Sequence, residues 1–558
     1  MENKQKFLKI IPLGGLGEVG RNMTIFEFEE KILIVDMGLK MPEESTPGID
    51  YIIPNSVYLK GKENNILGLI CTHGHLDHIG AIPYTIHRIG NPPIFTSKLT
   101  KALILKRQED FPQKTKLDIK EVKPGDEIDL FPFKILFFKQ THNIPENLGL
   151  VIKTPVGNIL HTSDFKFDQN PINDTPTDFE NLKELAKLDI LILMSDSTGA
   201  ENEGHSLSEQ QIFENLEKIF IESKGRIIVS TFASHINRIT QIISLSEKYG
   251  RKVFVAGKSM KDNVEIARNL KYIKTKKGTF QKIEDINKFE DEKITLLCTG
   301  AQGEPDASLM KITSGEFKFF QIKNGDTVIF SSSVIPGNER SVQNLKDNLY
   351  RQGAKVYHYQ MMDIHASGHA YQEELKEMIK IIKPKFFIPI HGQYSMLIKN
   401  IELAQEVGLK PENTICAENG QVIIATENKV YISKEKVQAN YVMVDGLGIG
   451  DVGEVVLRDR QALAKDGIFV IIAAIERETG RVKTSPDIIS RGFVYLRESK
   501  ELLKEVRKLV IKIIERASVS GGAVNWTFIK EEIKEKVGAF LFHKTKRRPM
   551  VISVIIEV

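Results

Sequence analysis

The 558-residue sequence has few cysteines and no long hydrophobic run, and each absence excludes a class of protein. Its three cysteines, Cys71, Cys298 and Cys416, lie far apart, which argues against a disulfide framework and is typical of a reducing compartment. No segment approaches the ~20 apolar residues that a transmembrane helix needs. The N-terminus also lacks the pattern of a signal peptide. We therefore expect a cytoplasmic protein with no membrane partner.

The sequence also lacks a large excess of either positive or negative charge. The sequence has 77 Lys and Arg residues against 73 Asp and Glu residues, a formal net charge of +4. Such a balance does not indicate a nucleic-acid partner, so an RNA-binding surface would have to come from a local arrangement of residues. At ~100–200 residues per domain, the length predicts about three or four domains.

Short apolar segments that end in His, Asp or Ser are frequent before residue 205. We expect β-strands in MTIFEFEEKILIVDMG, ILGLICTHG, FKILFFKQTH, GLVIKT, GNILHTSD and LDILILMSDST. From about residue 205 helical and strand patterns alternate, which predicts a parallel sheet with helices on its faces. Ligands of layered α/β folds gather where strands end, so the polar residues at these ends are candidate site residues.

These patterns predict an α/β protein in which one domain is interrupted by another. The outer domain is expected in residues 1–205 and, after its interruption, in residues 359–430. The inserted domain is expected in residues 206–358. A Gly-rich linker is expected in residues 431–452 and a small C-terminal α/β domain in residues 453–558.

The most informative segment is THGHLDHIG, residues 72–80. On an extended segment His73 and His75 share one side, whereas Asp77 and His78 turn into the next element and can face a second ion. Imidazole and carboxylate groups are ligands of zinc, manganese and related ions. Because one loop cannot complete two sites, further ligands must come from elsewhere in the chain.

Three further candidates follow predicted strands: His142 in QTHNIPE, Asp164 in LHTSDFKFD and His391 in PIHGQY. Taken alone, a histidine at a strand end is more often a structural hydrogen-bonding residue, and that alternative stays open. Beside a metal-binding loop, the same residues become candidate ligands.

With Asp36 in IVDMG, these motifs resemble the metallo-β-lactamase superfamily. SDST, HASGH and PIHG resemble three further motifs of the β-CASP nucleases. GGLGEVGRN, TFASHINR, TGAQGEP, IPGNE, SRGFVY and TKRRPM together resemble the bacterial ribonuclease J family. The resemblance extends from about residue 10 to the C-terminus. It implies a metallo-β-lactamase αββα sandwich interrupted by a β-CASP α/β domain, plus a small C-terminal α/β domain.

The resemblance also implies two ions, zinc in the first instance, with Mn²⁺ or Mg²⁺ as alternatives. It assigns one ion to His73, His75 and His142, the other to Asp77, His78 and His391, and the bridging position to Asp164. Asp36 would orient the loop without binding an ion. A structural calcium-like ion would bind at Gly48, Asp50 and Asp445, which also fit ordinary turns.

Phosphodiester cleavage needs a proton for the leaving 3′ oxygen. The expected catalytic residues are Asp77, His369 as general acid and Asp196 as the partner of His369. Turn capping is the alternative role for Asp196. The family's phosphate-contacting loop corresponds to His365, Ala366, Ser367, Gly368 and His369, where backbone amides can bind a phosphate. Weaker candidate RNA contacts, with strand-end or helix-cap roles as the alternative, are Ser234, His235, Arg238 and Ser331 to Ser333.

The implied activity is that of a two-metal ribonuclease in rRNA maturation and mRNA decay. It combines 5′-to-3′ exonuclease action, favouring 5′-monophosphate ends, with endonuclease action. His391 favours RNA, because DNA-processing β-CASP members tend to have Val there. Expected partners are RNA, further copies of the chain in a homodimer or homotetramer, and RNA-degradation proteins such as a helicase. Two alternatives stay open: a metallo-hydrolase of small molecules, which would not need the insertion, and a non-catalytic RNA-binding scaffold, which would not need every ligand.

Overall fold

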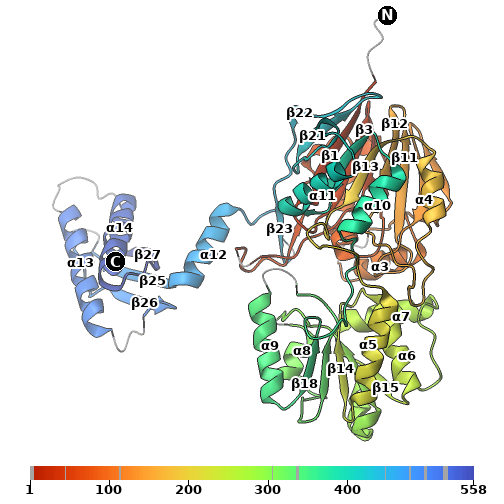
Figure 1. The fold of residues 1–558 in the computed structure, drawn as a ribbon. Helices are drawn as coiled ribbons and strands as arrows, with labels where there is room; N and C mark the ends of the chain where they lie inside the picture. Colours follow the sequence, from red (N-terminus) through yellow and green to blue (C-terminus); the bar gives the residue numbers. More distant parts are fainter. Residues whose placement is uncertain are drawn as a thin grey trace, which may run out of the picture. The chain divides into compact units, whose positions relative to one another are not determined.

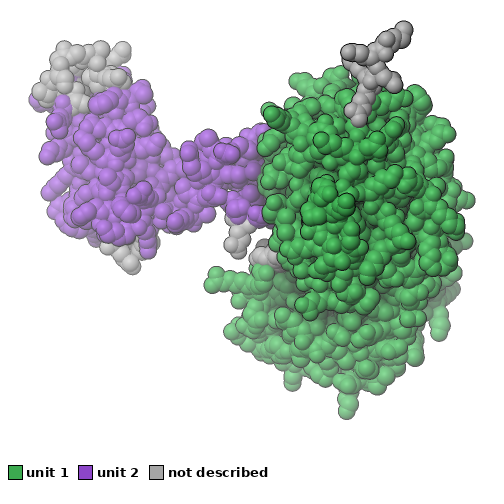
Figure 2. All heavy atoms as spheres, turned by 45° about the horizontal axis from the view of Figure 1, so that its top comes forward, with its two compact units in different colours: residues 1–41, 52–442 green, residues 42–51, 443–558 purple. Residues whose placement is uncertain are grey.

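The computed structural model describes residues 6–43, 45–111, 115–304, 306–334, 338–446, 448–476, 479, 481–494, 499–518 and 526–558. The chain forms two compact units, residues 1–41 with 52–442 and residues 42–51 with 443–558 (Figures 1 and 2). Each unit has a hydrophobic core of its own.

The first unit contains two β-sheets that enclose a common core (Figure 1). The eight-stranded sheet has the order β22 (Val430–Lys436), β21 (Gln421–Ala425), β1 (Leu8–Gly14), β3 (Met23–Phe28), β4 (Lys31–Val35), β6 (Ile66–Ile70), β7 (Ile94–Thr96) and β8 (Ile119–Glu121). The six-stranded sheet has the order β19 (Phe386–Ile390), β13 (Ile190–Asp196), β12 (Gly157–His161), β11 (Leu148–Thr154), β10 (Phe133–Lys139) and β9 (Glu127–Leu130).

Alternating apolar side chains hold the two sheets together. Along β10, Phe133, Ile135 and Phe137 are fully buried in the core between the sheets. The next residue, Phe138, belongs to a second core on the other face of this sheet, which is covered by α4 (Phe179–Ala186), α10 (Gln372–Ile382) and α11 (Tyr394–Glu406). Successive side chains of a strand point to opposite faces, so one strand serves both cores.

The inserted domain is a five-stranded parallel sheet with helices on both faces. Its strand order is β15 (Lys252–Val255), β16 (Ile294–Cys298), β14 (Ile227–Ser230), β17 (Thr327–Phe330) and β18 (Lys355–His358). One core packs against α5 (Glu209–Glu222), α6 (Ile236–Lys248) and α7 (Lys258–Asn269). The other packs against α8 (Ser308–Thr313) and α9 (Glu339–Arg351). This alternation confirms the predicted parallel α/β domain.

The insertion leaves the sandwich after β13 and returns through β19. These two strands are parallel neighbours, and β12 is the parallel neighbour of β13 on its other side. Their carboxyl ends therefore meet at one edge of the sheet. Asp164 follows β12, Asp196 ends β13 and His391 follows β19, so the topology collects three candidate residues there.

Two expectations differ from the structure. The segment MTIFEFEEKILIVDMG forms two antiparallel strands, β3 and β4, because the chain reverses at Glu29, which has a left-handed φ of 55°. Residues 431–436, expected in the linker, lie in β22, which pairs with β21. In this part of the chain the two units divide between residues 442 and 443.

The second unit contains a three-stranded sheet in the order β26 (Asp487–Arg491), β25 (Ile468–Ile475) and β27 (Met550–Glu557). Its helices are α12 (Glu454–Asp466), α13 (Lys500–Ser518) and α14 (Trp526–Thr545). One face of the sheet packs with α13 and α14 in a core of its own. Across the described parts of the chain, no helix has the length and apolar character to span a membrane.

Candidate metal centre

The segment THGHLDHIG connects β6 to the short helix α1 (Leu76–Ile79). His73 and His75 lie on its extended part, and His75 is the N-cap residue of α1. Asp77 and His78 lie on the first turn of the helix and therefore face a different direction. Gly38 permits this packing, because a Cβ atom there would lie 1.5 Å from the carbonyl oxygen of Asp77.

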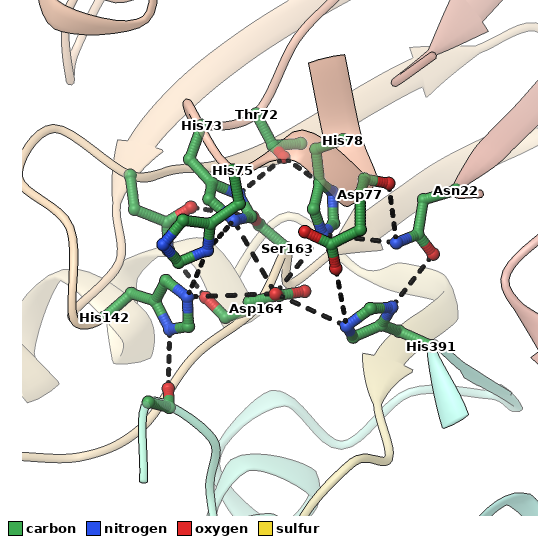
Figure 3. A network of polar contacts seen from close by, with 12 residues as sticks. Asn22, Thr72, His73, His75, Asp77, His78, His142, Ser163, Asp164 and His391 are labelled. Carbon is green, nitrogen blue, oxygen red and sulfur yellow. Dashed lines mark hydrogen bonds and ion pairs between the residues drawn. The ribbon is translucent and has the colours of Figure 1, made fainter. Parts of the chain in front are cut away.

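One set of ring nitrogens converges between His73, His75 and His142 (Figure 3). His75 Nδ1 lies 3.0 Å from His73 Nε2 and 3.2 Å from His142 Nε2. Behind this set, His142 Nδ1 lies 2.6 Å from the carbonyl oxygen of Gly368, to which it donates, so Nε2 keeps its lone pair. Burial lowers the pKa of His73 and His142 well below the usual value and that of His75 to about 4. These rings are therefore neutral, as metal ligands must be.

A second set of atoms converges between Asp77, His78 and His391 (Figure 3). Asp77 Oδ2 lies 3.5 Å from His78 Nε2 and 3.6 Å from His391 Nε2. His78 Nδ1, on the far side of its ring, lies 2.7 Å from Asp36 Oδ2. Asp36 also accepts hydrogen bonds from the backbone and hydroxyl of Thr72. It faces the back of His78 and not the converging atoms.

Asp164 belongs to both sets. Its Oδ2 atom lies 3.6 Å from His73 Nε2, 3.8 Å from His142 Nε2, 3.2 Å from His78 Nε2 and 3.5 Å from His391 Nε2. Its other oxygen is buried without a hydrogen-bond partner among the described residues. Two cations that share this carboxylate fit the donor set, which holds imidazole nitrogens and carboxylate oxygens only.

The second set and Asp164 are electrostatically coupled. Burial opposes protonation of His78, but the carboxylates of Asp164, Asp77 and Asp36 outweigh it and raise its pKa well above the usual value. Burial likewise opposes ionisation of Asp164, yet His391 and His78 hold its pKa well below the usual range. The ionised form of Asp164 thus depends on electrostatic stabilisation from the imidazole side chains around it, a role that a bound cation would take over.

Asp196 and His369 form a pair beside these two sets. Asp196 is 1% exposed, and its Oδ2 lies 2.7 Å from His369 Nδ1. Its Oδ1 accepts a hydrogen bond from the backbone of Thr198, so the carboxylate both pairs with His369 and caps the turn. Burial opposes protonation of His369, but Asp196 outweighs it and raises the pKa of His369 to about 9. The atoms of these two residues also lie within 4.8 Å of ligand atoms of Asp164 and His391.

The loop His365–His369 rests on the first set of ligands. A Cβ atom on Gly368 would lie 2.5 Å from the ring of His142, so the backbone approaches that ring as closely as only glycine allows. Within the loop, the backbone of His369 donates to the Ser367 hydroxyl. His365 is mostly buried, and burial lowers its pKa to about 3.

The weaker candidate RNA contacts are mainly buried. Arg238 is 0% exposed, and its guanidinium donates to both carboxylate oxygens of Glu209, at 3.0 and 2.8 Å. It also donates to Ser331 Oγ and to the carbonyl oxygen of Ile364. His235 and Ser331 are buried as well. For Arg238 the structural alternative therefore holds, because its charge is already neutralised inside the protein.

The residues expected to bind a structural calcium-like ion contact other groups of the chain. Arg460 donates to the carbonyl oxygen of Gly48, at 3.0 Å, and to the carboxylate of Asp445. Asp50 accepts from the backbone of Gly446. Arg460 of the chain itself thus contacts two of the residues expected to bind the ion. The sequence motif did not reveal this because Arg460 lies outside it, on α12.

One residue of the site was not identified from the sequence. Asn22 contacts His391, Asp77 and His78. It ends the segment GGLGEVGRN, which the resemblance had marked without a role for any residue. A polar residue directly after a glycine-rich turn was the available signal.

Family models match four parts of the chain. Residues 16–198 match the metallo-beta-lactamase superfamily, and residues 354–415 match the Zn-dependent metallo-hydrolase RNA specificity domain. Residues 224–349 match the beta-CASP domain of ribonuclease J, and residues 455–558 match the ribonuclease J C-terminal domain.

Relatives are similar over almost the whole chain. Ribonuclease J2 of Bacillus subtilis (strain 168) is 36% identical over 551 residues, which cover 99% of this chain and 99% of that protein. Ribonuclease J 1 of Streptococcus pyogenes serotype M3 is 38% identical over 547 residues, which cover 98% of this chain and 97% of that protein. A protein of unknown function from Enterococcus faecalis V583 shares the fold, with a TM-score of 0.53 at 14% identity over 77% of this chain and 100% of that chain.

These matches confirm the predicted fold class, a metallo-β-lactamase domain with a β-CASP insertion and a C-terminal domain. They also support a metal cofactor, since the zinc-dependent models coincide with the His and Asp cluster. By its similarity over nearly the full length, the chain belongs to the ribonuclease J family of metallo-β-lactamase-fold ribonucleases.

Proposed function

We propose that the chain hydrolyses RNA phosphodiester bonds with two divalent cations. The observation that carries this proposal is the convergence of seven side chains in two sets that share Asp164. His73, His75 and His142 would hold one cation and Asp77, His78 and His391 the other, and bound cations there would supply an activated water and charge stabilisation for the phosphoryl oxygens. The match of residues 354–415 to an RNA specificity domain supports RNA as the substrate.

The donor chemistry supports zinc in both positions. Three imidazoles and a carboxylate, from His73, His75, His142 and Asp164, suit Zn²⁺. The second set, from Asp77, His78, His391 and Asp164, has a larger share of oxygen and also suits Mn²⁺. We propose Zn²⁺ in both positions, with Mn²⁺ or Mg²⁺ as alternative working ions. Asp36 orients His78 from behind.

His369 is the proposed general acid for the leaving 3′ oxygen. Its ring lies beside those of His142 and His391, with centroid distances of 5.2 and 5.6 Å. Asp196 holds Nδ1 and keeps the ring protonated at neutral pH, which leaves Nε2–H free to donate. The proton that the leaving oxygen requires can therefore come from this chain.

The loop His365–His369 is the proposed contact for a substrate phosphate. It lies between the ring of His142 and the inserted domain, to which Arg238 ties it through Ile364. A phosphate held there would place the first nucleotide next to the metal centre. We propose on this basis a preference for 5′-monophosphate ends and 5′-to-3′ exonuclease action beside endonuclease action, in rRNA maturation and mRNA decay. The free cysteines support a reducing, cytoplasmic setting.

The deciding experiment uses purified full-length protein and RNA with a 5′-monophosphate or a 5′-triphosphate. We expect cleavage with Zn²⁺ or Mn²⁺, its loss with chelator and faster trimming of the monophosphate end. Absence of RNA cleavage with every divalent ion would reject the proposal. Hydrolysis of small esters or lactones under the same conditions would then favour the small-molecule alternative.

A second copy of the chain is the proposed occupant of the open face of the C-terminal sheet. This face is mainly apolar and half-buried or exposed, with the charged Asp487 and Arg491 on its edge strand. Its apolar residues are Ile468, Val470, Ile472, Ile489, Ile552, Val554 and Ile556. Contiguous apolar faces of this kind mark interaction sites. We propose a homodimer or homotetramer. In sedimentation, Val554→Asp should yield monomers, whereas Lys534→Asp on the surface of α14 should not. If both variants assemble like the wild type, this face is not the interface between copies.

A further inference from the structure

The side chain of Asn22 reaches all three residues of the second set. Its Oδ1 lies 2.9 Å from His391 Nδ1. Its Nδ2 donates to the carbonyl oxygen of Asp77, at 3.1 Å, and lies 3.2 Å from His78 Nε2 (Figure 3). Its backbone N–H also donates to the carbonyl oxygen of Asp77. The described contacts of this side chain all belong to the second set, and none reaches His73, His75 or His142.

The glycine-rich segment explains how an asparagine arrives at this position. A Cβ atom on Gly14 would lie 1.9 Å from the carbonyl oxygen of Arg21, and one on Gly15 would lie 2.2 Å from Asn22 Oδ1. Only glycine at these two positions allows the segment to fold back on itself with the amide inside. Buried Arg21, with a left-handed φ of 59°, fixes the turn through its ion pair with Glu18, at 2.8 Å.

The same segment is attached to the residues that follow His391. The short strands β2 (Leu16–Gly17) and β20 (Gly392–Gln393) pair in parallel. The backbone of Gly392 also donates to the carbonyl oxygen of Gly15. His391 itself has a left-handed φ of 52°. Its ring is thus positioned from two sides, by the β2–β20 pairing through the backbone and by Asn22 through the ring.

Amide chemistry fixes the orientation of Asn22 and the tautomer of His391. The NH₂ group must face the carbonyl oxygen of Asp77, because the reverse orientation would bring two acceptors together. The amide oxygen therefore faces His391 and can only accept, so the imidazole carries its proton on Nδ1. Nε2 then presents its lone pair toward Asp77 and Asp164, which lie 3.6 and 3.5 Å away. That is the form a histidine ligand needs.

We infer that Asn22 is the positioning residue of the second ion, and this inference rests on the two-ion function proposed above. It sets the tautomer of His391 and holds the first turn of α1, which carries Asp77 and His78. The first ion depends on other supports, namely Gly368 behind His142 and Thr72 behind His73. Loss of the amide should therefore weaken one ion and leave the other unchanged.

The test is a titration of the metal-free, full-length protein with Co²⁺ against a competing chelator, followed by absorption spectroscopy. We expect two bound ions for the wild-type chain. For Asn22→Ala we expect one ion at unchanged affinity and the other weakened about 10–100-fold, the usual cost of losing a supporting hydrogen bond. Asn22→Asp keeps an acceptor for His391 but places an oxygen against Asp77. Its affinity for the second ion should therefore lie between those of the wild type and of Asn22→Ala.

Asn419→Ala is the matched control. The Asn419 amide makes three hydrogen bonds to Leu16 and Glu18 in the same glycine-rich segment. Its described contacts include no candidate ligand, so both ions should bind as in the wild type. Equal weakening of both ions in Asn22→Ala, or two ions at wild-type affinity, would overturn the inference.

Two further outcomes separate the inference from the function on which it rests. Fewer than two ions on the wild-type chain would contradict the two-ion function and not the role of Asn22. If Asn22→Ala does not fold, as judged by circular dichroism, the near-isosteric Asn22→Asp carries the same test. Unchanged binding of both ions by a folded Asn22→Asp variant would then reject the inference.

Discussion

Two of the buried clusters of ionisable side chains described in the first unit are built in opposite ways. In the metal centre, the carboxylates of Asp77 and Asp164 face imidazole rings, and no Lys or Arg joins them in the described ion pairs. The second, here called the arginine cluster, consists of Lys166, Asp168, Glu209, His235 and Arg238. Its carboxylates are neutralised by cations of the chain.

The difference lies in where the positive charge comes from. In the arginine cluster, Glu209 accepts from Arg238 on both oxygens and from Gln241 on one. In the metal centre, one oxygen of Asp164 has no partner in the described structure and the other faces four ring nitrogens. A buried carboxylate that faces only imidazole rings, with no Lys or Arg in its described ion pairs, indicates a cation from outside. The first cluster is a binding site, and the second joins parts of the fold.

The largest expected effect comes from removing two proposed ligands of the proposed second ion. Asp77→Ala combined with His78→Ala should lower RNA cleavage by at least ~10³-fold, because bound metal supplies several kcal/mol of transition-state stabilisation. The fold should persist, since both side chains lie on the single turn of α1. Cleavage rate, bound metal and circular dichroism are the measurements. Unchanged cleavage would break the comparison, because the converging atoms would then have no catalytic role.

His369→Ala should have the next largest effect. Losing the proton donor should slow cleavage about 10²–10⁴-fold while both ions stay bound. His369→Gln keeps a polar side chain of similar size and should be as slow, since it cannot supply the proton. Metal content measured beside the rate separates the two roles. A lost ion would make His369 a ligand and extend the metal centre to the group that it forms with Asp164, Asp196 and His391.

The arginine cluster should respond in stability and not in metal binding. Arg238→Met leaves the buried carboxylate of Glu209 without its main partner, and breaking a buried pair costs about 3–5 kcal/mol. Denaturant unfolding should show this loss, with two ions still bound to the folded variant. Lys187→Met removes an exposed ion pair with Glu184 and should cost at most about 1 kcal/mol. Equal stability of the two variants would show that the arginine cluster contributes little.

The sequence predicted the strands and the ends at which the site lies. Asp164, Asp196 and His391 could be found because each ends or follows an apolar strand, and parallel neighbours bring such ends to one edge. HxHxDH was informative because its ligands are local. The spacing along this one segment is enough to indicate that its side chains point in two directions.

What the sequence did not show depends on contacts between distant segments. Asn22 meets His391 across 369 residues, and Arg238 meets Ile364 across 126. Arg238 in TFASHINR had the composition of an RNA contact, and only its burial against Glu209 shows otherwise. Arg460 is a similar case, since nothing local indicates that it faces Gly48 and Asp445. Charge in a motif does not reveal whether a partner already neutralises it.

The smallest expected effect is a pH dependence of folding stability that comes from Glu209 in the arginine cluster. Burial raises the pKa of Glu209, but Arg238, Lys166 and His235 outweigh it and hold the pKa below the usual 4.5. A depressed pKa in the folded state contributes stability above the unfolded value, and this contribution is lost as the pH falls below about 4.5. Glu209→Gln carries no titrating group at this position. The wild-type chain should therefore be more stable than the variant at pH 7, and the difference should narrow from pH 4.5 downward.

Unfolding measured with and without chelator separates this effect from the metal centre. Chelator should lower the stability of the wild type and of Glu209→Gln by the same amount, because Glu209 touches none of the candidate ligands in its described contacts. The difference between the two proteins at each pH should then be independent of metal. A difference that stays constant from pH 7 down to pH 3 would show that folding does not lower the pKa of Glu209. The arginine cluster would then lack the internal ion pair that distinguishes it from the metal centre.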